Sequence, residues 1–136
     1  MLSWIYYAFF ALLMWGVWGF LPKLTTTFVD PKSAMVYETI GFLSVAAVIF
    51  LLARGRMDFH PKGFLFAFLT GIAGSLGALA FLHAMSRTKA SIVVTTTSLY
   101  PVVSILLAFL LLKERITLTQ GLGMGFALVA LILFSL

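Results

Sequence analysis

One acidic side chain, Glu38, lies well inside an apolar stretch of the chain that runs over residues 31–53. At about 1.5 Å of helical rise per residue, Glu38 lies about 7 Å from the centre of that stretch. An ionisable group at such depth in a bilayer usually faces a cavity or a partner, and it often marks an ion or proton pathway. A proton and a cation can compete for one carboxylate, which is the physical core of proton-coupled antiport. The alternative is a carboxylate near a helix start that reaches water and is favoured there by the helix dipole.

Aromatic and hydroxyl side chains that can line a solute site lie in the same stretch and in two others. Trp15 and Trp18 are one turn apart in the first stretch, and Trp15 lies deeper than the residues of an interfacial aromatic belt. Aromatic rings hold apolar or cationic solutes by stacking and by cation–π attraction. We therefore predict a substrate or coupling-ion site that draws on Glu38, Trp15, Trp18, Tyr37, Thr96, Thr97, Ser98 and Tyr100.

A proline, Pro101, lies in the middle of the apolar stretch over residues 89–112. Proline inside a helix removes the hydrogen bond to the carbonyl four residues earlier, here that of Thr97, and kinks the helix. The hydroxyls of residues 95–98 can satisfy backbone groups that such a kink loosens. The sequence therefore predicts either a kinked, hydroxyl-lined helix that shapes a cavity or a kink that serves packing alone.

Small residues and one further glutamate are predicted to be structural. Glycines in two of the stretches have spacings at which transmembrane helices approach each other closely. Glu114, between two basic residues of a short loop, can stabilise the N-terminus of the helix that follows it. The predicted structural set is Gly71, Gly74, Gly77, Gly121, Gly125 and Glu114.

The chain offers little chemistry for an enzyme. Its apolar stretches hold no paired carboxylates, no Ser/His arrangement and no His/Glu spacing suited to a metal ion. The sequence contains no cysteine, which excludes disulfides and thiolate metal sites. We therefore expect no catalytic residue, no metal and no cofactor.

The elements that must position these residues follow from the composition. Hydrophobic residues make up 62% of the 136 residues and charged residues only 10%, whereas soluble proteins have about 25% charged residues. A bilayer core needs about 20 helical residues, and helix-start signals such as Asp30-Pro31 and His60-Pro61 divide the chain at that spacing. The predicted fold is all-α, a single domain over residues 1–136 with five transmembrane helices at about 3–22, 31–53, 61–85, 89–112 and 117–135. A capping box over residues 117–120 opens the last helix.

Basic residues are divided almost evenly between the two sides of the predicted membrane domain. Lys and Arg residues 54, 56, 62, 113 and 115 fall on one side, and residues 23, 32, 87 and 89 fall on the other. Because the excess of Lys/Arg in short loops sets orientation, this division is compatible with insertion in both orientations or with one orientation that leaves the N-terminus inside. The net charge of +5 then serves contact with anionic lipid headgroups, and no nucleic-acid partner is expected.

Several short motifs occur in a recognisable order. Trp15-Gly16, Lys23 and Asp30-Pro31 open the chain, Leu99-Tyr100-Pro101-Val102 supplies the proline, and Lys113-Glu114-Arg115 precedes Gln120-Gly121. In this order and spacing they resemble the drug/metabolite transporter superfamily, and specifically a single EamA-type repeat of five helices. The resemblance covers nearly the full length of the chain.

The resemblance implies a secondary transporter that moves a small metabolite or drug-like solute through the membrane by alternating access, with proton coupling as one form. Most members carry two repeats in one chain, so one repeat implies a homodimer, antiparallel if the chain inserts both ways, or a heteromer with a related repeat. An odd number of spans also places the termini on opposite sides, so two copies in tandem would be inverted, as in many transporters. The alternative function is a non-transporting membrane assembly or a lipid-handling subunit. Either way we expect a multi-pass integral protein of a bacterial or archaeal plasma membrane. In a cell with two membranes this is the inner membrane.

Overall fold

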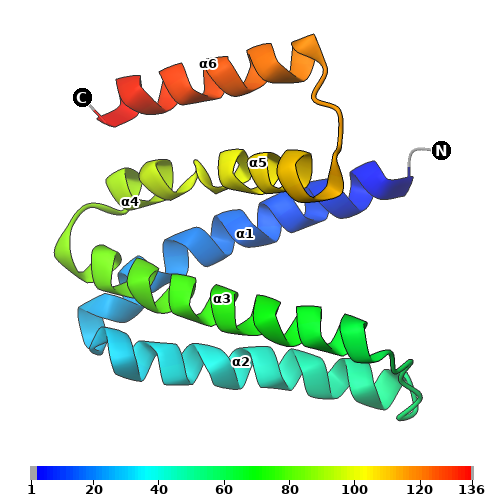
Figure 1. The fold of residues 1–136 in the computed structure, drawn as a ribbon. Coiled ribbons are helices and arrows are strands. Elements are labelled where there is room, and N and C mark those ends of the chain that lie inside the picture. The colour runs from blue at the N-terminus through cyan, green and yellow to red at the C-terminus, as the bar shows by residue number, and fades with distance from the viewer. Residues whose placement is uncertain (1–2, 136) are drawn as a thin grey trace. The chain divides into compact units, whose positions relative to one another are not determined.

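The predicted all-α fold is confirmed by the computed structural model, which describes residues 3–135, with the side chains of residues 3–130, 132 and 133. The helices are α1 (Ser3–Phe28), α2 (Pro31–Leu52), α3 (Pro61–Arg87), α4 (Ala90–Thr97), α5 (Tyr100–Leu112) and α6 (Leu118–Ser135), as Figure 1 shows. Within the described residues, α1, α2, α3 and the segment Ala90–Leu112 are each long and apolar enough to cross a membrane. The apolar part of α6 described without interruption, Leu118–Ala130, is shorter.

Large apolar side chains point outward along the helices, which is the reverse of the arrangement in a soluble protein. Phe10, Leu43, Phe66 and Leu111 are examples that are more than half exposed. A soluble protein buries most such residues, whereas lipid tails are as apolar as these side chains. The exposed surface of the helices is therefore suited to contact with acyl chains, as expected for a membrane helical bundle.

The first helix is longer than the sequence predicted. It continues six residues beyond the predicted end at residue 22, through Lys23 to Phe28, so that Lys23 lies on the helix and not in a loop. The hydroxyls of residues 25–27 donate to carbonyls three or four residues earlier, for example Thr26 to that of Pro22 at 2.8 Å. These bonds let three polar residues extend a helix end that composition alone assigns to the loop.

The second helix begins and ends with capping structures. Asp30 is its N-cap, as predicted, and its carboxylate accepts hydrogen bonds from the backbone N–H groups of Lys32 and Ser33. At the other end, Arg54 and Gly55 have positive φ angles of 52° and 70°. Their N–H groups donate to the carbonyls of Leu51 and Phe50, the pattern of a Schellman motif. This tight turn reverses the chain toward α3, and α2 and α3 then lie side by side in opposite directions (Figure 1).

The described chain divides into two compact units, one up to Arg87 and one from Thr88. In the first unit, the end of α1, the start of α2 and the end of α3 pack together around small residues. Gly19, Pro22 and Ala34 are buried there with Ala78 of α3, which is 5% exposed. The larger buried residues at this junction are Phe81, Leu82 and Met85. Small side chains let the three backbones approach, as transmembrane helix packing requires.

In the second unit, the predicted fourth span is broken into two helices. Ser98 and Leu99 lie between α4 and α5, and Pro101 occupies the first turn of α5. The sequence predicted Pro101 in the middle of one kinked helix. The structure places it where a missing N–H costs nothing, and the break comes before it because proline restricts the residues that precede it. Thr117 and Gln120 form the predicted capping box at the start of α6.

The glycines predicted to mark close helix contacts do not do so within either unit. A Cβ placed at Gly71, Gly74, Gly77, Gly121 or Gly125 would meet no described atom within 4 Å outside its own helix backbone and chain neighbours. In the first unit, Ala78 and Ala34 make the close approach instead. Spacing identifies which residues can share a helix face, but the rotation of each helix decides which face meets a neighbour.

Candidate functional site

A hydrogen bond joins two of the residues that the sequence singled out. The indole Nε1–H of Trp18, in the second half of α1, donates to the Oε1 atom of Glu38 on α2. Both side chains are half-buried. A hydrogen bond to an ionised carboxylate is roughly twice as strong as one between neutral groups. In a membrane the hydrophobic effect does not drive helices together, so a bond of this kind between α1 and α2 contributes to their association.

Phe81 of α3 packs against the Trp18–Glu38 pair. Its ring stacks on the indole of Trp18 with centroids 5.3 Å apart and planes inclined by 19°. Phe81 is itself only 7% exposed, so its position is fixed by the packing around it. Trp18 therefore contacts α2 through its N–H group and α3 through its ring face. A change at Glu38 would alter contacts among all three helices.

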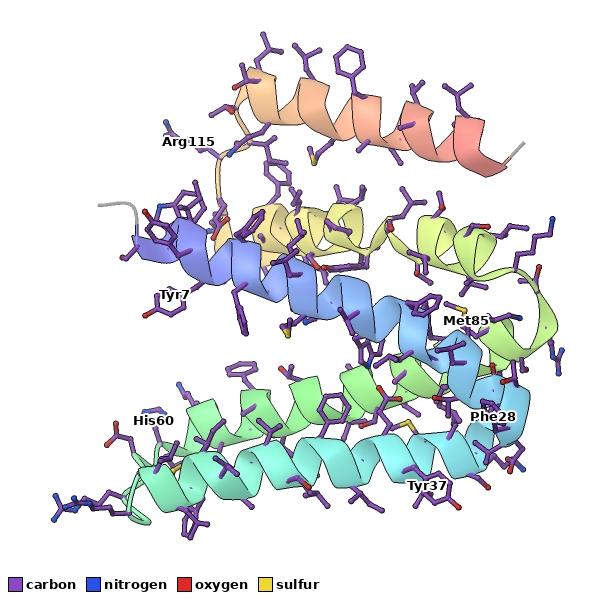
Figure 2. The ribbon with its side chains drawn as sticks, turned by 180° about the vertical axis from the view of Figure 1, so that it is seen from behind. Tyr7, Phe28, Tyr37, His60, Met85 and Arg115 are labelled. Atoms are coloured by element: carbon purple, nitrogen blue, oxygen red, sulfur yellow. The ribbon has the colours of Figure 1, made fainter. Side chains whose placement is uncertain are left out.

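Five residues further along α1, Lys23 makes a second link between helices. Its Nζ atom donates to the backbone carbonyl of Met85 at 2.9 Å. Met85 lies in the last turn of α3 (Figure 2), where carbonyl groups lack partners within the helix and carry a partial negative charge. The ammonium group thus caps the C-terminus of α3 and holds it against α1.

Phe81 and Lys23 were missed by the sequence reasoning. Phe81 is one of 14 phenylalanines, and nothing in its spacing distinguishes it from those that face lipid. Lys23 was assigned to a loop, because the helix was expected to end at residue 22. Its helical position five residues beyond Trp18 would have signalled a link to α3 only if the length of α1 had been known.

The two other predicted residues of the first unit are more exposed. Trp15 is 62% exposed and Tyr37 is 59% exposed. Figure 2 shows the ring of Tyr37 directed away from α3, although its neighbour Glu38 reaches toward α1. Consecutive residues of a helix point about 100° apart, so Tyr37 and Glu38 cannot both face α1.

The hydroxyls predicted to line the site lie in the second unit and bond to their own helix. Thr96 donates to the carbonyl of Ile92 at 2.8 Å, and Ser98 donates to that of Val94 at 2.7 Å. Thr97 donates to the carbonyl of Val93 at 2.9 Å. Tyr100 opens α5 and is 56% exposed. These bonds satisfy the hydroxyl donors at the end of α4 before the break, and each oxygen keeps a lone pair that can accept a further bond.

A groove of about 720 Å³ lies within the second unit, between α5 with the end of α4 and α6. Ser98 and Pro101 line it at the break, and Glu114 lines it near the α5–α6 connection. Most of the remaining lining is aliphatic. Of the residues predicted from the sequence, Ser98, Pro101 and Glu114 therefore share one concave surface.

The family of the chain follows from comparison with known proteins. A model of the EamA-like transporter family matches residues 2–136, so the chain belongs to that family. This membership, together with the apolar helices, makes the chain an integral membrane protein of a family that transports small solutes. The resemblance inferred from the motifs is confirmed.

Among related proteins, an uncharacterized protein of the archaeon Methanocaldococcus jannaschii is 27% identical over 124 residues. The match covers 91% of this chain and 90% of the relative, so the two correspond along nearly their full lengths. No solved structure matches the chain.

Proposed function

We propose that this chain is a secondary transporter in which Glu38 binds the transported solute and a proton in turn. The observation that carries the proposal is the hydrogen bond from Trp18 to Glu38 between α1 and α2. Protonation makes the carboxyl group a weaker acceptor, and a bound cation competes with the indole for the same oxygens. Each event weakens a link between helices, which is how binding can bias one arrangement of the bundle over another.

The cargo that suits this cluster is a small solute with an apolar part and a positive charge, such as an amine or an amino-acid-like metabolite. Glu38 supplies the negative charge, and the stacked rings of Trp18 and Phe81 supply an aromatic surface. A cation over an aromatic face gains up to about 2 kcal/mol when water is excluded. Both interactions are available within one part of the molecule.

Transport in this proposal requires a second repeat, either another copy of the chain in inverted orientation or a related chain. The exposed apolar faces of the described helices leave ample surface for such a partner. The even division of loop Lys and Arg supports inverted pairing. The archaeal relative, matched over 90% of its length by this one-repeat chain, supports placement in an archaeal or bacterial plasma membrane.

The test of the proposed function is solute exchange by purified protein in liposomes, screened against a panel of amines and amino acids. Glu38→Gln keeps the size of the side chain and cannot titrate, so proton-linked exchange should fall about tenfold or more. Glu38→Asp should retain exchange with a changed pH profile, because the carboxylate persists one methylene further back. Asp58→Asn, at an exposed residue of the connection between α2 and α3, is the matched control and should exchange like the parent chain. Equal exchange and equal pH dependence in Glu38→Gln and the parent would assign Glu38 a structural role.

The paired orientation has its own test. Because the sequence contains no cysteine, single cysteines at Arg56 and Lys89 report the sides of the membrane without background. Inverted pairing predicts that each position is labelled from both sides of sealed vesicles by an impermeant maleimide. Labelling of each position from one side only would replace the inverted homodimer with a parallel dimer or a heteromer.

A further inference from the structure

The groove of the second unit is open along an apolar wall and has its charged residues at one end. Val102, Ile105 and Phe109 of α5 form one side, and Gly123, Met124 and Ala127 of α6 form the other. The non-helical connection over residues 113–117 separates the facing ends of the two helices. Small residues on α6 leave the width of the groove unfilled, because a Cβ at Gly123 would meet no atom within 4 Å outside its own helix backbone and chain neighbours.

A positively charged and a negatively charged side chain lie at the end of the groove that is formed by the connection between α5 and α6. Glu114 and Arg115 both line the groove and both are exposed, and Figure 2 shows Arg115 where α5 turns toward α6. Among the described residues, neither side chain makes a hydrogen bond or an ion pair. Gln120, also in the lining, is committed to the capping box, where its Oε1 accepts the N–H of Thr117 at 2.8 Å.

The position of these charges matches the depth of lipid headgroups. The connection follows the end of the membrane-spanning segment Ala90–Leu112, so it lies at a membrane surface while the apolar walls extend into the hydrocarbon. A groove of about 720 Å³ lies within the range of small-molecule sites, roughly 300–1,000 Å³. An amphiphile with an apolar chain and a head that carries both charges matches the apolar walls and the charged end. The hydroxyls of Thr95 and Ser98 at the other end donate to carbonyls of α4 and need no ligand.

We propose that the groove binds one membrane phospholipid with a zwitterionic ethanolamine head. Arg115 binds the phosphate, Glu114 binds the ammonium group, and one acyl chain lies between α5 and α6. Arg suits phosphate because its planar fork donates two parallel hydrogen bonds. The inference rests on the lining and the charges of the second unit and is independent of the transport role of Glu38.

The test measures lipid binding to the full-length chain, purified in detergent with its lipids removed, by native mass spectrometry with added phosphatidylethanolamine. Gly123→Leu fills the groove with a side chain for which the Cβ has room, so the lipid dissociation constant should rise about tenfold or more. Gly125→Leu is the matched control, because its Cβ is equally unobstructed and it does not line the groove. Gly125→Leu should bind the lipid like the parent chain.

Further arms separate the head from the chain and protect the test against misfolding. Arg115→Gln, which leaves the groove intact, should bind phosphatidylethanolamine about tenfold more weakly, with helix content by circular dichroism unchanged. Soluble glycerophosphoethanolamine, which has the head alone, should not displace the lipid. Equal lipid binding by the parent, Gly123→Leu and Arg115→Gln overturns the proposal. A dimer mass in the parent that becomes a monomer mass only in Gly123→Leu also overturns it, since the groove then holds a second copy of the chain.

Discussion

The two units of the chain differ in whether the described polar side chains form hydrogen bonds between helices. In the first, Trp18 and Lys23 of α1 form hydrogen bonds with two other helices, around a junction that buries small residues. In the second, the hydroxyls of residues 95–98 bond to carbonyls of their own helix. Val93 is the one buried hydrophobic residue among the described residues of this unit. Helix association in a membrane depends on close packing and bonds between helices. The first unit has both, whereas the second leaves a groove between α5 and α6 unfilled.

The difference predicts which substitutions the chain tolerates, and the largest effect is expected at the tight junction. Ala78→Leu should lower the free energy of unfolding by about 1–3 kcal/mol, because a larger side chain has no room beside α1 and α2. Ala127→Leu, the same change on the groove side of α6, should be nearly neutral in detergent without added lipid. Unfolding in SDS followed by circular dichroism measures both. Equal losses would mean that the two units are packed alike.

A smaller effect is expected from the bond between helices. Trp18→Phe keeps a ring that can stack on Phe81 but removes the N–H donor to Glu38, so stability should fall by about 0.6–2 kcal/mol. Thr97→Val removes a hydroxyl that bonds within α4, and it should change stability by less. The same unfolding experiment compares them. A larger loss in Thr97→Val would reverse the contrast between the units.

Much of the fold could be predicted from sequence because its signals are local. Apolar length and the caps at Asp30, Pro61 and Thr117 place the starts of α2, α3 and α6 to within one residue. Proline is compatible both with a kink inside a helix and with the first turn of a new helix, so the break before Pro101 could not be placed. The end of α1 could not be placed either, because it depends on how side chains bond to nearby carbonyls. Hydropathy carries no information about such bonds.

The candidate site was predicted in part for a related reason. Depth in an apolar stretch identified Glu38 and Trp18 separately, but their pairing depends on the rotation of α1 against α2. Phe81 has no property in the sequence that separates it from lipid-facing phenylalanines, and it is distinguished only by its burial at 7% exposure. Whether the hydroxyls of residues 96–98 and Tyr100 contribute to the same site stays a prediction.

Substitutions in the turns test whether the two units differ only in how their helices pack and bond, or also in the turns at the helix ends. Arg54 and Lys113, one in each unit, both have the left-handed backbone conformation, with φ angles of 52° and 55°. A non-glycine residue in this conformation is strained by about 1–2 kcal/mol, which exceeds the roughly 0.5–1 kcal/mol that the flexibility of glycine costs. Arg54→Gly and Lys113→Gly should therefore each raise stability by about 0.5–1 kcal/mol. Arg56→Gly, where φ is not positive, is the control and should not stabilise. A gain in one unit alone would show that the turns also differ.

The smallest effect is a pH dependence confined to the first unit. Hydrogen bonds from the Ser33 hydroxyl, and then from the N–H groups of Ser33 and Lys32, lower the pKa of Asp30 below its usual 3.8. A carboxyl group whose pKa is lower in the folded state stabilises the fold above its unfolded pKa, and this contribution is lost as the pH falls through the folded pKa. Asp30→Ser keeps a cap that does not titrate, so stability measured from about pH 6 to pH 3 should fall less steeply than in the parent chain. Parallel curves for the two would remove Asp30 from the acid response.

The most direct test of the central claim, that Glu38 exchanges a proton for the solute, is proton release on binding. The solute identified by the liposome screen is added to purified protein in weakly buffered solution, and the released protons are counted with a pH indicator. The account predicts release by the parent chain and by Asp58→Asn, and none by Glu38→Gln. Equal release by Glu38→Gln, or saturable binding by the parent chain without release at any pH between about 5 and 8, would contradict it.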